Sequence, residues 1–197
     1  QDHPAPAAEA DLPPSQRTWI NLPPKDNLTT RASYQHPISK KYTEQRLALH
    51  KEAEQDYASR LKKAVGQKVA YLTGGAPGSG KGSLVKAVLA LHPDAQVLDS
   101  DEVMMKWVPE MEQFLHEDAD TAAGRAYLEA GDLTDKLADQ ASKFGANIII
   151  DGTLSRKDID DVIDQLHRYG YEVHGRFIDV PLEVSKQRNI DRANDPN

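Results

Sequence analysis

An α/β fold, with a parallel sheet covered by helices on both faces, is predicted by the way apolar runs and helix-like stretches alternate along the chain. The apolar runs are short, as strands are. They cover residues 68–73, 96–98, 147–150 and 172–180. Helical patterns over 82–91, 134–144 and 157–169 lie between or beside them. Strands that alternate with helices pair in parallel, because each crossover returns the chain to the same end of the sheet.

Length and composition set limits on the architecture. The chain has 197 residues, of which 39% are hydrophobic, and this is enough for one domain with a core. Its formal net charge of −7 argues against general binding to nucleic acid or anionic membranes, which need clustered Lys and Arg. No run approaches about 18 apolar residues, so no membrane span is predicted. The lack of cysteine excludes disulfides, thiolate metal sites and a Cys nucleophile.

The first 40 residues differ in composition from the rest. They hold seven of the twelve prolines and only scattered apolar residues. Such a segment buries too little apolar surface to offset its ordering entropy, so residues 1–40 are expected to form an extended or mobile Pro-rich arm. A plain linker is the simpler interpretation. Trp19 with Ile20 is the place where docking on the domain would be plausible.

From Tyr42 onward the sequence shows helical periodicity. Positions three, four or seven residues apart are apolar or aromatic, at Leu47, His50, Tyr57, Leu61 and Ala64 or Val65. Thr43 is placed to cap the start of this helix and Gly66 to end it. Because His50 lies on the apolar stripe, we expect it to pack in the core rather than to bind a ligand.

A glycine-rich run connects the first strand to the next helix, which is the setting of a phosphate-binding loop. Residues 75–81 match the pattern G-x-x-x-x-G-K. Glycines let backbone N–H groups point inward, the helix N-terminus adds positive charge, and Lys81 can reach the outer phosphates of a nucleoside triphosphate. We therefore expect one continuous stretch to bind ATP. It comprises Gly75, Ala76, Pro77, Gly78, Ser79, Gly80, Lys81, Gly82 and Ser83.

The residue directly after the lysine departs from the usual pattern. This position commonly carries the Ser or Thr that holds Mg²⁺, and here it is Gly82. A hydroxyl follows one residue later, at Ser83. The order lysine, glycine, hydroxyl resembles the adenylate-kinase variant of the loop. We expect Ser83 and Asp99 to hold Mg²⁺.

Chemically useful side chains also follow the second and third strands. The second strand leads into Asp99 and Asp101, and the third into Asp151 and Thr153. In a parallel sheet, ligands bind at the carboxyl ends of the strands, so we expect these residues and the phosphate loop to converge on one cleft. Acidic residues at such turns also serve as helix caps, which is the alternative for the Asp pair taken alone.

Phosphoryl transfer to a hydroxyl is the chemistry that suits these groups. It needs a phosphate cradle, a metal ion, a carboxylate that takes the acceptor's proton, and cations near the transferred group. Of Asp99 and Asp101, one can face Mg²⁺ and the other the acceptor. Arg188 and Arg192, four residues apart on a predicted helix, are candidates for the cations at the substrate site, although their spacing suits two solvated arginines equally well.

As an ordered set, these residues resemble the zeta-toxin group of P-loop kinases. The resemblance covers about residues 41–196 and each of its motifs alone recurs in other kinases. Its parts are Tyr42-Thr43-Glu44-Gln45-Arg46 with Leu49-His50, the loop at 74–81, Asp-x-Asp at 99–101, Asp-Gly-Thr at 151–153, and Pro181 followed by Arg188 and Arg192. The stretch from Thr73 to Asp101 and the Pro-rich leader are also similar to zeta-related type III effectors of the Avr-Rxo type.

The resemblance implies transfer of the ATP γ-phosphate to the 3′-hydroxyl of a nucleotide-linked metabolite, UDP-N-acetylglucosamine for the toxins and NAD for the effectors. Lys81 would bind the phosphates, Asp101 would be the base, and Arg192 would contact the transferred phosphate. Asp151, where the toxins often have Glu, and Thr153 would line the acceptor site. A small antitoxin or chaperone protein would be the partner. The protein would act in the cytoplasm, or inside a host cell if it is an effector.

Two other functions fit parts of the sequence. Asp-x-Asp after the second strand also resembles shikimate-type kinases, and Asp151-Gly152 resembles adenylate kinases, so the acceptor could be a small polyol or a nucleoside monophosphate. A non-catalytic nucleotide-binding module is the third possibility, and an intact Lys81 and Asp101 argue against it.

The kinase domain is expected to cover residues 41–197 and to be incomplete at its C-terminal end. The family continues there into a lid, a second arginine and another strand. The edge of the fourth strand, near Phe177 and Ile178, would then lack a neighbour. Residues 1–197 alone are accordingly expected to be poorly soluble or inactive. Adding the missing sequence, or a partner that covers this edge, is expected to restore activity.

Overall fold

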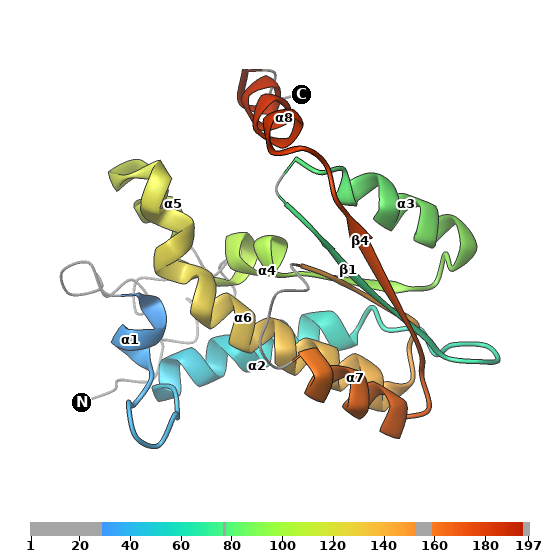
Figure 1. Cartoon of the computed structure of the whole chain (residues 1–197). Coiled ribbons are helices and arrows are strands. Elements are labelled where there is room, and N and C mark those ends of the chain that lie inside the picture. Colours follow the sequence, from blue (N-terminus) through green and yellow to red (C-terminus); the bar gives the residue numbers. More distant parts are fainter. Residues whose placement is uncertain (1–28, 77, 153–158, 195–197) are drawn as a thin grey trace. The chain divides into compact units, whose positions relative to one another are not determined.

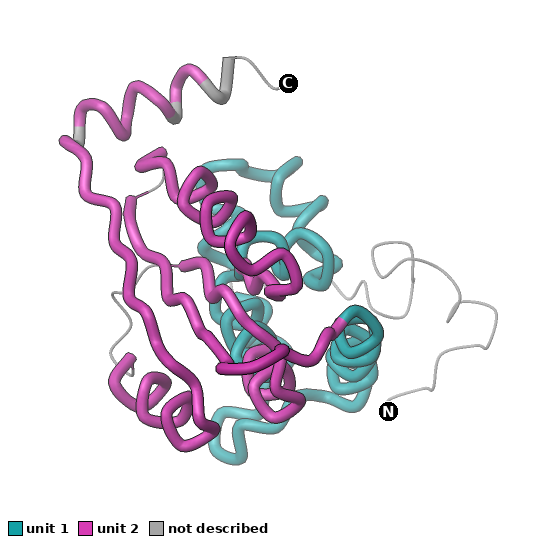
Figure 2. Tube along the Cα trace, turned by 90° about the vertical axis from the view of Figure 1, so that its right-hand side faces the viewer, with its two compact units in different colours: residues 1–60, 100–137 teal, residues 61–99, 138–197 magenta. Residues whose placement is uncertain are grey.

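The computed structural model describes residues 29–76, 78–152 and 159–194. They form two compact units, one within residues 1–60 and 100–137 and one within 61–99 and 138–197, which Figure 2 colours separately. Most of the expected Pro-rich arm, with Trp19 and Ile20, lies outside the described residues. Within its described part, Thr30–Tyr34 form the short helix α1, and Thr29 caps it by accepting a hydrogen bond from the Ala32 amide.

The second unit is built on a four-stranded parallel sheet (Figure 1). The strands are β1 (Val69–Gly75), β2 (Gln96–Asp99), β3 (Ile148–Asp151) and β4 (Glu172–Ile178). Their order is β2-β3-β1-β4, and every neighbouring pair is parallel. The predicted α/β class and all four predicted strands are confirmed. β1 is central and buried along its length, whereas β4 lies at an edge of the described sheet, with the Phe177 side chain 64% exposed.

Several helices, among them the end of α6 (Ala119–Phe144), accompany this sheet in the described part of the unit. Helix α3 (Lys81–Leu91) packs Val85 and Val88 against Tyr71 of β1 and Ile149 of β3. Helix α7 (Ile159–Arg168) is tied to the end of α6 by a 2.8 Å hydrogen bond from Gln165 Nε2 to Asp139 Oδ1. Helix α8 (Leu182–Asn194) follows β4. The predicted helices at 82–91 and 157–169 are confirmed over their described residues.

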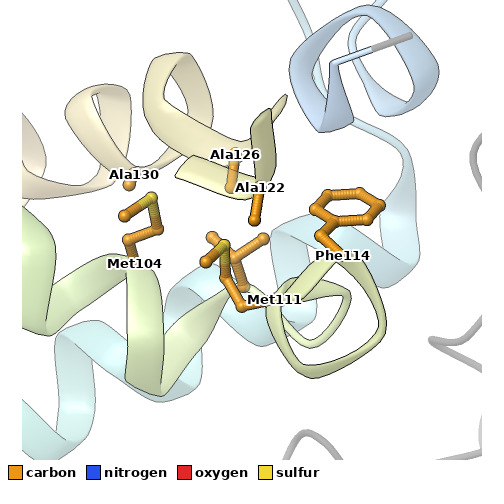
Figure 3. Packing of buried hydrophobic residues seen from close by; sticks show 7 residues of the cluster. Met104, Met111, Phe114, Ala122, Ala126 and Ala130 are labelled. Carbon is orange, nitrogen blue, oxygen red and sulfur yellow. The ribbon is translucent and has the colours of Figure 1, made fainter. Parts of the chain in front are cut away.

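The first unit is helical. Besides α1 it contains α2 (Glu44–Ala58), α4 (Ser100–Trp107), α5 (Met111–Glu117) and the greater part of α6 (Ala119–Phe144). One hydrophobic cluster of its core consists of three larger apolar side chains and Val108 packed on a row of alanines of α6 (Figure 3). The cluster comprises Met104, Val108, Met111, Phe114, Ala122, Ala126 and Ala130. Small residues four apart let neighbouring helices approach α6 closely, and the sequence pattern had indicated only the last part of this helix.

The predicted helix from Thr43 to Gly66 is right at its start and wrong at its end. Thr43 caps α2, accepting a hydrogen bond from the Arg46 amide, and His50 is buried as expected. The helix ends at Ala58, however, and the Val65 side chain is 95% exposed. The Ala64 amide donates to the Gly145 carbonyl at 2.9 Å instead of to a carbonyl one turn back. A long-range backbone bond has therefore replaced the last turns of the predicted helix.

Candidate active site

The loop between β1 and α3 has a backbone that only glycine can adopt at key points. Gly75, Gly78 and Gly80 have φ angles of 150°, 78° and 105°. A Cβ atom on Gly75 would lie 2.6 Å from Ser79 Oγ and 2.7 Å from the Ile178 carbonyl oxygen. Such contacts are too short for any side chain, so the loop closes tightly on itself and on the end of β4. Pro77 lies outside the described residues.

Lys81 is the first residue of α3, at the positive end of the helix. Its Nζ donates a 3.0 Å hydrogen bond to the Gly75 carbonyl, so the ammonium group folds back over the loop. The lysine and the helix N-terminus thus place positive charge at the same point. A polyphosphate is the ligand that this combination favours.

Other parts of the loop also fit a bound nucleotide. The Ser79 hydroxyl is buried and has no hydrogen-bond partner among the described residues, and such a group is expected to gain one when a ligand binds. Gly82 and Ser83 are exposed on the first turn of α3. A Cβ on Gly82 would have nothing within 4 Å, so packing does not require glycine there. A hydroxyl at Ser83 and a carboxylate at Asp99 are oxygen ligands of the type that Mg²⁺ takes.

Three polar residues lie in a row across the carboxyl ends of the central strands. The register pairs Thr73 of β1 with Asp151 of β3, and Asp151 with Asp99 of β2. The Thr73 hydroxyl donates a 2.5 Å hydrogen bond to Asp151 Oδ1. The structure therefore brings Asp99 and Asp151 to the carboxyl ends of the strands, where the phosphate loop also begins, as the sequence predicted. Thr73 was not foreseen, because its role depends on strand register.

Arg188 of α8 reaches the phosphate loop. Its Nη1 atom donates to the carbonyl oxygens of Gly78 and Ser79, at 3.4 and 3.2 Å. A guanidinium group is thus held beside the loop, where the sequence placed a cation for the substrate. Arg192 is part of the same helix, and its side chain lies outside the described residues, as Thr153 does.

The two aspartates of the Asp-x-Asp motif belong to different units. Asp99 ends β2 in the second unit, whereas Asp101 lies in the first turn of α4 in the first unit. The Asp101 side chain is exposed. Its expected meeting with the phosphate loop stays a prediction.

The first unit contains a buried charge cluster that the sequence did not reveal. Arg46 of α2 donates to Glu110 Oε2 at 2.5 Å, and its Nε lies 3.2 Å from Glu129 Oε1. His50 Nε2 lies 3.0 Å from the same Glu129 oxygen, while the Lys136 ammonium lies 3.3 Å from His50 Nδ1. Arg46, His50, Glu110 and Glu129 are each at most 2% exposed.

Burial and pairing pull on these groups in opposite directions. Burial raises the pKa of the Glu110 carboxyl, and Arg46 only partly offsets this. Burial also acts to raise the pKa of Glu129, but His50 and Arg46 outweigh it and the pKa is lowered. The two carboxylates in turn raise the pKa of Arg46 against the effect of burial. The charged side chains of the cluster pair with one another, as those of a structural element do. A glutamate on the apolar stripe of α6 was a sequence signal for it, as was His50 on the stripe of α2.

The parallel sheet, with a glycine-rich loop and a lysine at the start of the next helix, defines a P-loop protein. The sequence model of the family described as Zeta toxin matches residues 52–196. The chain therefore belongs to the zeta toxin family, in agreement with the resemblance of its motifs.

Solved structures support the same fold. One from a study of the PezAT chromosomal toxin–antitoxin system of Streptococcus pneumoniae superimposes with a TM-score of 0.66 at 22% identity, covering 79% of this chain and 65% of that one. The native complex of AvrRxo1-ORF1 with AvrRxo1-ORF2 gives 0.51 at 19% identity, and the same complex with ATP gives 0.53 at 18%. Both cover 77% of this chain and 51% of the other.

The chain thus spans between half and two thirds of the length of these structures. No curated protein sequence matches it significantly. Among the described residues, no helix is both long and apolar enough to cross a membrane.

Proposed function

We propose that the protein is a kinase that transfers the γ-phosphate of ATP to a sugar or ribose hydroxyl of a nucleotide-linked metabolite. The observation that carries this proposal is the phosphate loop with Lys81 beside the row of Thr73, Asp151 and Asp99 at one sheet edge. A nucleotide cradle and carboxylates at the ends of neighbouring strands are the parts that phosphoryl transfer to a hydroxyl requires. Membership of the zeta toxin family and the fold shared with an ATP complex support it.

In this proposal the loop from Gly75 to Ser83 binds the triphosphate through its backbone amides, and Lys81 balances the charge of the outer phosphates. Its ammonium group leaves the Gly75 carbonyl to do so. Ser83 and Asp99 would hold Mg²⁺, whose chemistry is to neutralise the phosphate oxygens during transfer. Arg188, already beside Gly78 and Ser79, would add a second cation, with Arg192 on the same helix.

Asp101 would be the base and Asp151, with Thr153, would hold the acceptor. As the acceptor oxygen bonds to the γ-phosphorus, its proton passes to the Asp101 carboxylate. The bond between the γ-phosphorus and the bridging oxygen breaks, and ADP leaves with the electron pair. The 3′-hydroxyl of NAD and that of UDP-N-acetylglucosamine are the acceptors we propose.

We further propose that the protein acts as a toxin or effector that a small protein partner holds silent. One similar structure comes from a study of a toxin–antitoxin system and another is a complex of two proteins, which supports this proposal. Action in the cytoplasm, or in a host cell after secretion, would follow. The kinase domain would cover residues 41–197.

The test is transfer of label from γ-labelled ATP to a panel of acceptors. The panel contains NAD, UDP-N-acetylglucosamine, nucleoside monophosphates and shikimate, each with Mg²⁺ and with EDTA in its place. The proposal predicts a labelled product from NAD or UDP-N-acetylglucosamine that requires Mg²⁺. Labelling confined to a nucleoside monophosphate or shikimate would make the protein a metabolic kinase. Binding of ATP without any transfer would leave a nucleotide-binding module.

A further inference from the structure

We propose that Thr73 is a positioning residue for the acceptor: its hydroxyl fixes the Asp151 carboxylate so that one oxygen is left to bind a substrate hydroxyl. This inference rests on the proposed function, because it assigns Asp151 to the acceptor site. Thr73 opens the stretch that resembles the effectors, but no function follows for it from that resemblance.

The first argument is the rigidity of the donor. Thr73 lies on the central strand β1 and its side chain is 1% exposed. A β-branched side chain has few accessible χ1 rotamers, and burial inside a sheet restricts them further. Its hydroxyl oxygen lies 2.5 Å from Asp151 Oδ1 and 3.5 Å from the Ile150 carbonyl, so the carboxylate is its close partner. The hydroxyl therefore holds Asp151 from a fixed point.

The second argument is the charge on the other side of Asp151. Asp99 is its register partner on β2, so two carboxylates stand at the same level of neighbouring strands. Like charges placed directly opposite repel each other. A donor on β1 draws the Asp151 carboxylate away from Asp99 and offsets part of that repulsion. The sheet thus separates a carboxylate for the metal side, Asp99, from one for the acceptor side, Asp151.

The third argument is the oxygen that this bond does not use. Thr73 bonds to Oδ1, and Oδ2 has no hydrogen bond to another described residue, so it can accept from a second donor. Asp151 is only half-buried, whereas Thr73 is fully buried, so a ligand can approach the carboxylate but not the threonine. A carboxylate held on one side and open on the other suits a hydroxyl donor such as those of a ribose or pyranose ring. Thr73 would therefore act on acceptor affinity and orientation through Asp151.

The experiment compares Thr73→Val, which keeps the shape and removes the hydroxyl, with Thr73→Ser, which restores it. Thr134→Val is the matched control, because Thr134 is a buried threonine whose hydroxyl bonds to the Ala130 carbonyl within its own helix. Thr73→Val is expected to lower kcat/KM for the acceptor by about 10- to 100-fold, the range for a hydrogen bond to a charged group. KM for ATP is expected to stay within about twofold of the wild type. Thr73→Ser is expected to recover most of the loss, and Thr134→Val to show none.

A double-mutant cycle with Asp151→Ala separates positioning from general packing. If Thr73 acts through Asp151, then Thr73→Val has little further effect on acceptor kinetics once Asp151 is alanine. Equal losses in both backgrounds, or an unchanged acceptor kcat/KM in Thr73→Val, would overturn the inference.

A spectroscopic readout keeps this test independent of turnover. The side-chain carboxyl ¹³C resonance of Asp151 is expected to move in Thr73→Val, to return in Thr73→Ser and to stay in place in Thr134→Val. An unmoved resonance in Thr73→Val would overturn the inference even in a protein that transfers phosphate. A wild-type protein that transfers phosphate to no acceptor would overturn the proposed function, and the resonance would then decide whether Thr73 fixes Asp151.

Discussion

The two units handle polar side chains in opposite ways. In the first unit, Arg46 is buried and forms ion pairs with Glu110 and Glu129. In the second unit, the phosphate loop and Asp151 stand at the carboxyl ends of strands, where a ligand can approach them. The first arrangement pairs buried charges with one another, and the second presents groups that a ligand can reach.

The contrast shows how to tell a structural charge from a functional one. Burying an ion pair costs desolvation free energy, and removing one partner of a buried pair destabilises the protein. A charge that waits for a ligand is tolerated where it is bonded to the backbone in the meantime, as Lys81 is to the Gly75 carbonyl. Changes within the buried cluster should therefore affect stability, and changes to groups that wait for a ligand should affect activity.

Lys81→Ala is expected to have the largest effect on activity. Removing a cation from the transferred phosphates costs on the order of 10³-fold or more in phosphoryl transfer. The free energy of unfolding is expected to change by no more than about 0.5 kcal/mol, since the side chain is not packed in the core. Lys86→Ala, an exposed lysine of the same helix, is the control and should match the wild type in both. Transfer by Lys81→Ala within about tenfold of the wild type would rule out the phosphate-loop interpretation.

The two aspartates of the motif are expected to differ. Asp101→Asn should lower kcat by about 10² to 10⁴, the usual contribution of a general base, and leave ATP binding intact. Asp99→Asn should lower kcat less, because an amide oxygen can replace part of a metal contact that runs through water. Steady-state rates at saturating ATP and Mg²⁺, with ATP affinity measured separately, check both. A larger loss in Asp99→Asn would reverse the two roles.

Arg46→Ala tests the buried cluster. It leaves the Glu110 and Glu129 carboxylates buried without their guanidinium partner, which is expected to lower the free energy of unfolding by about 3–5 kcal/mol. Chemical denaturation of the intact chain measures this loss of free energy of unfolding. Arg60→Ala, which removes a surface pair with Asp56, is the control and should cost no more than about 1 kcal/mol. Similar small losses in both variants would show that the cluster is not a stabilising element.

Gly75→Ala is expected to have the smallest effect among these predictions. The added Cβ would meet Ser79 Oγ and the Ile178 carbonyl at under 3 Å, and φ is positive. The free energy of unfolding is therefore expected to fall by about 1–3 kcal/mol, and ATP binding to weaken. Gly82→Ala meets nothing within 4 Å and should be neutral or slightly stabilising, because alanine favours the helix. Thermal unfolding and ATP titration of this pair give the answer. Equal behaviour of the two variants would show that the loop does not close as described.

The sheet and the loop were predictable because their signals are local. Strand, glycines and Lys81 follow one another within a short stretch of sequence, and the parallel topology follows from the alternation of elements. The partners of Arg46 were not predictable, since Glu110 lies 64 residues away along the chain. Thr73 was missed for the same reason, because only the register of β1 with β3 brings it to Asp151. The predicted end of α2 was wrong because the Ala64 amide donates to the Gly145 carbonyl, which lies far away along the chain.

The division between the units can be tested most directly by amide hydrogen exchange on the intact chain, with and without ATP and Mg²⁺. Our account predicts that the strongest added protection falls on residues 74–84, at the phosphate loop and the first turn of α3. The buried cluster around Arg46, Glu110 and Glu129 should exchange at the same rate in both conditions. Added protection centred on that cluster, or no change over residues 74–84, would contradict the assignment of nucleotide binding to the loop.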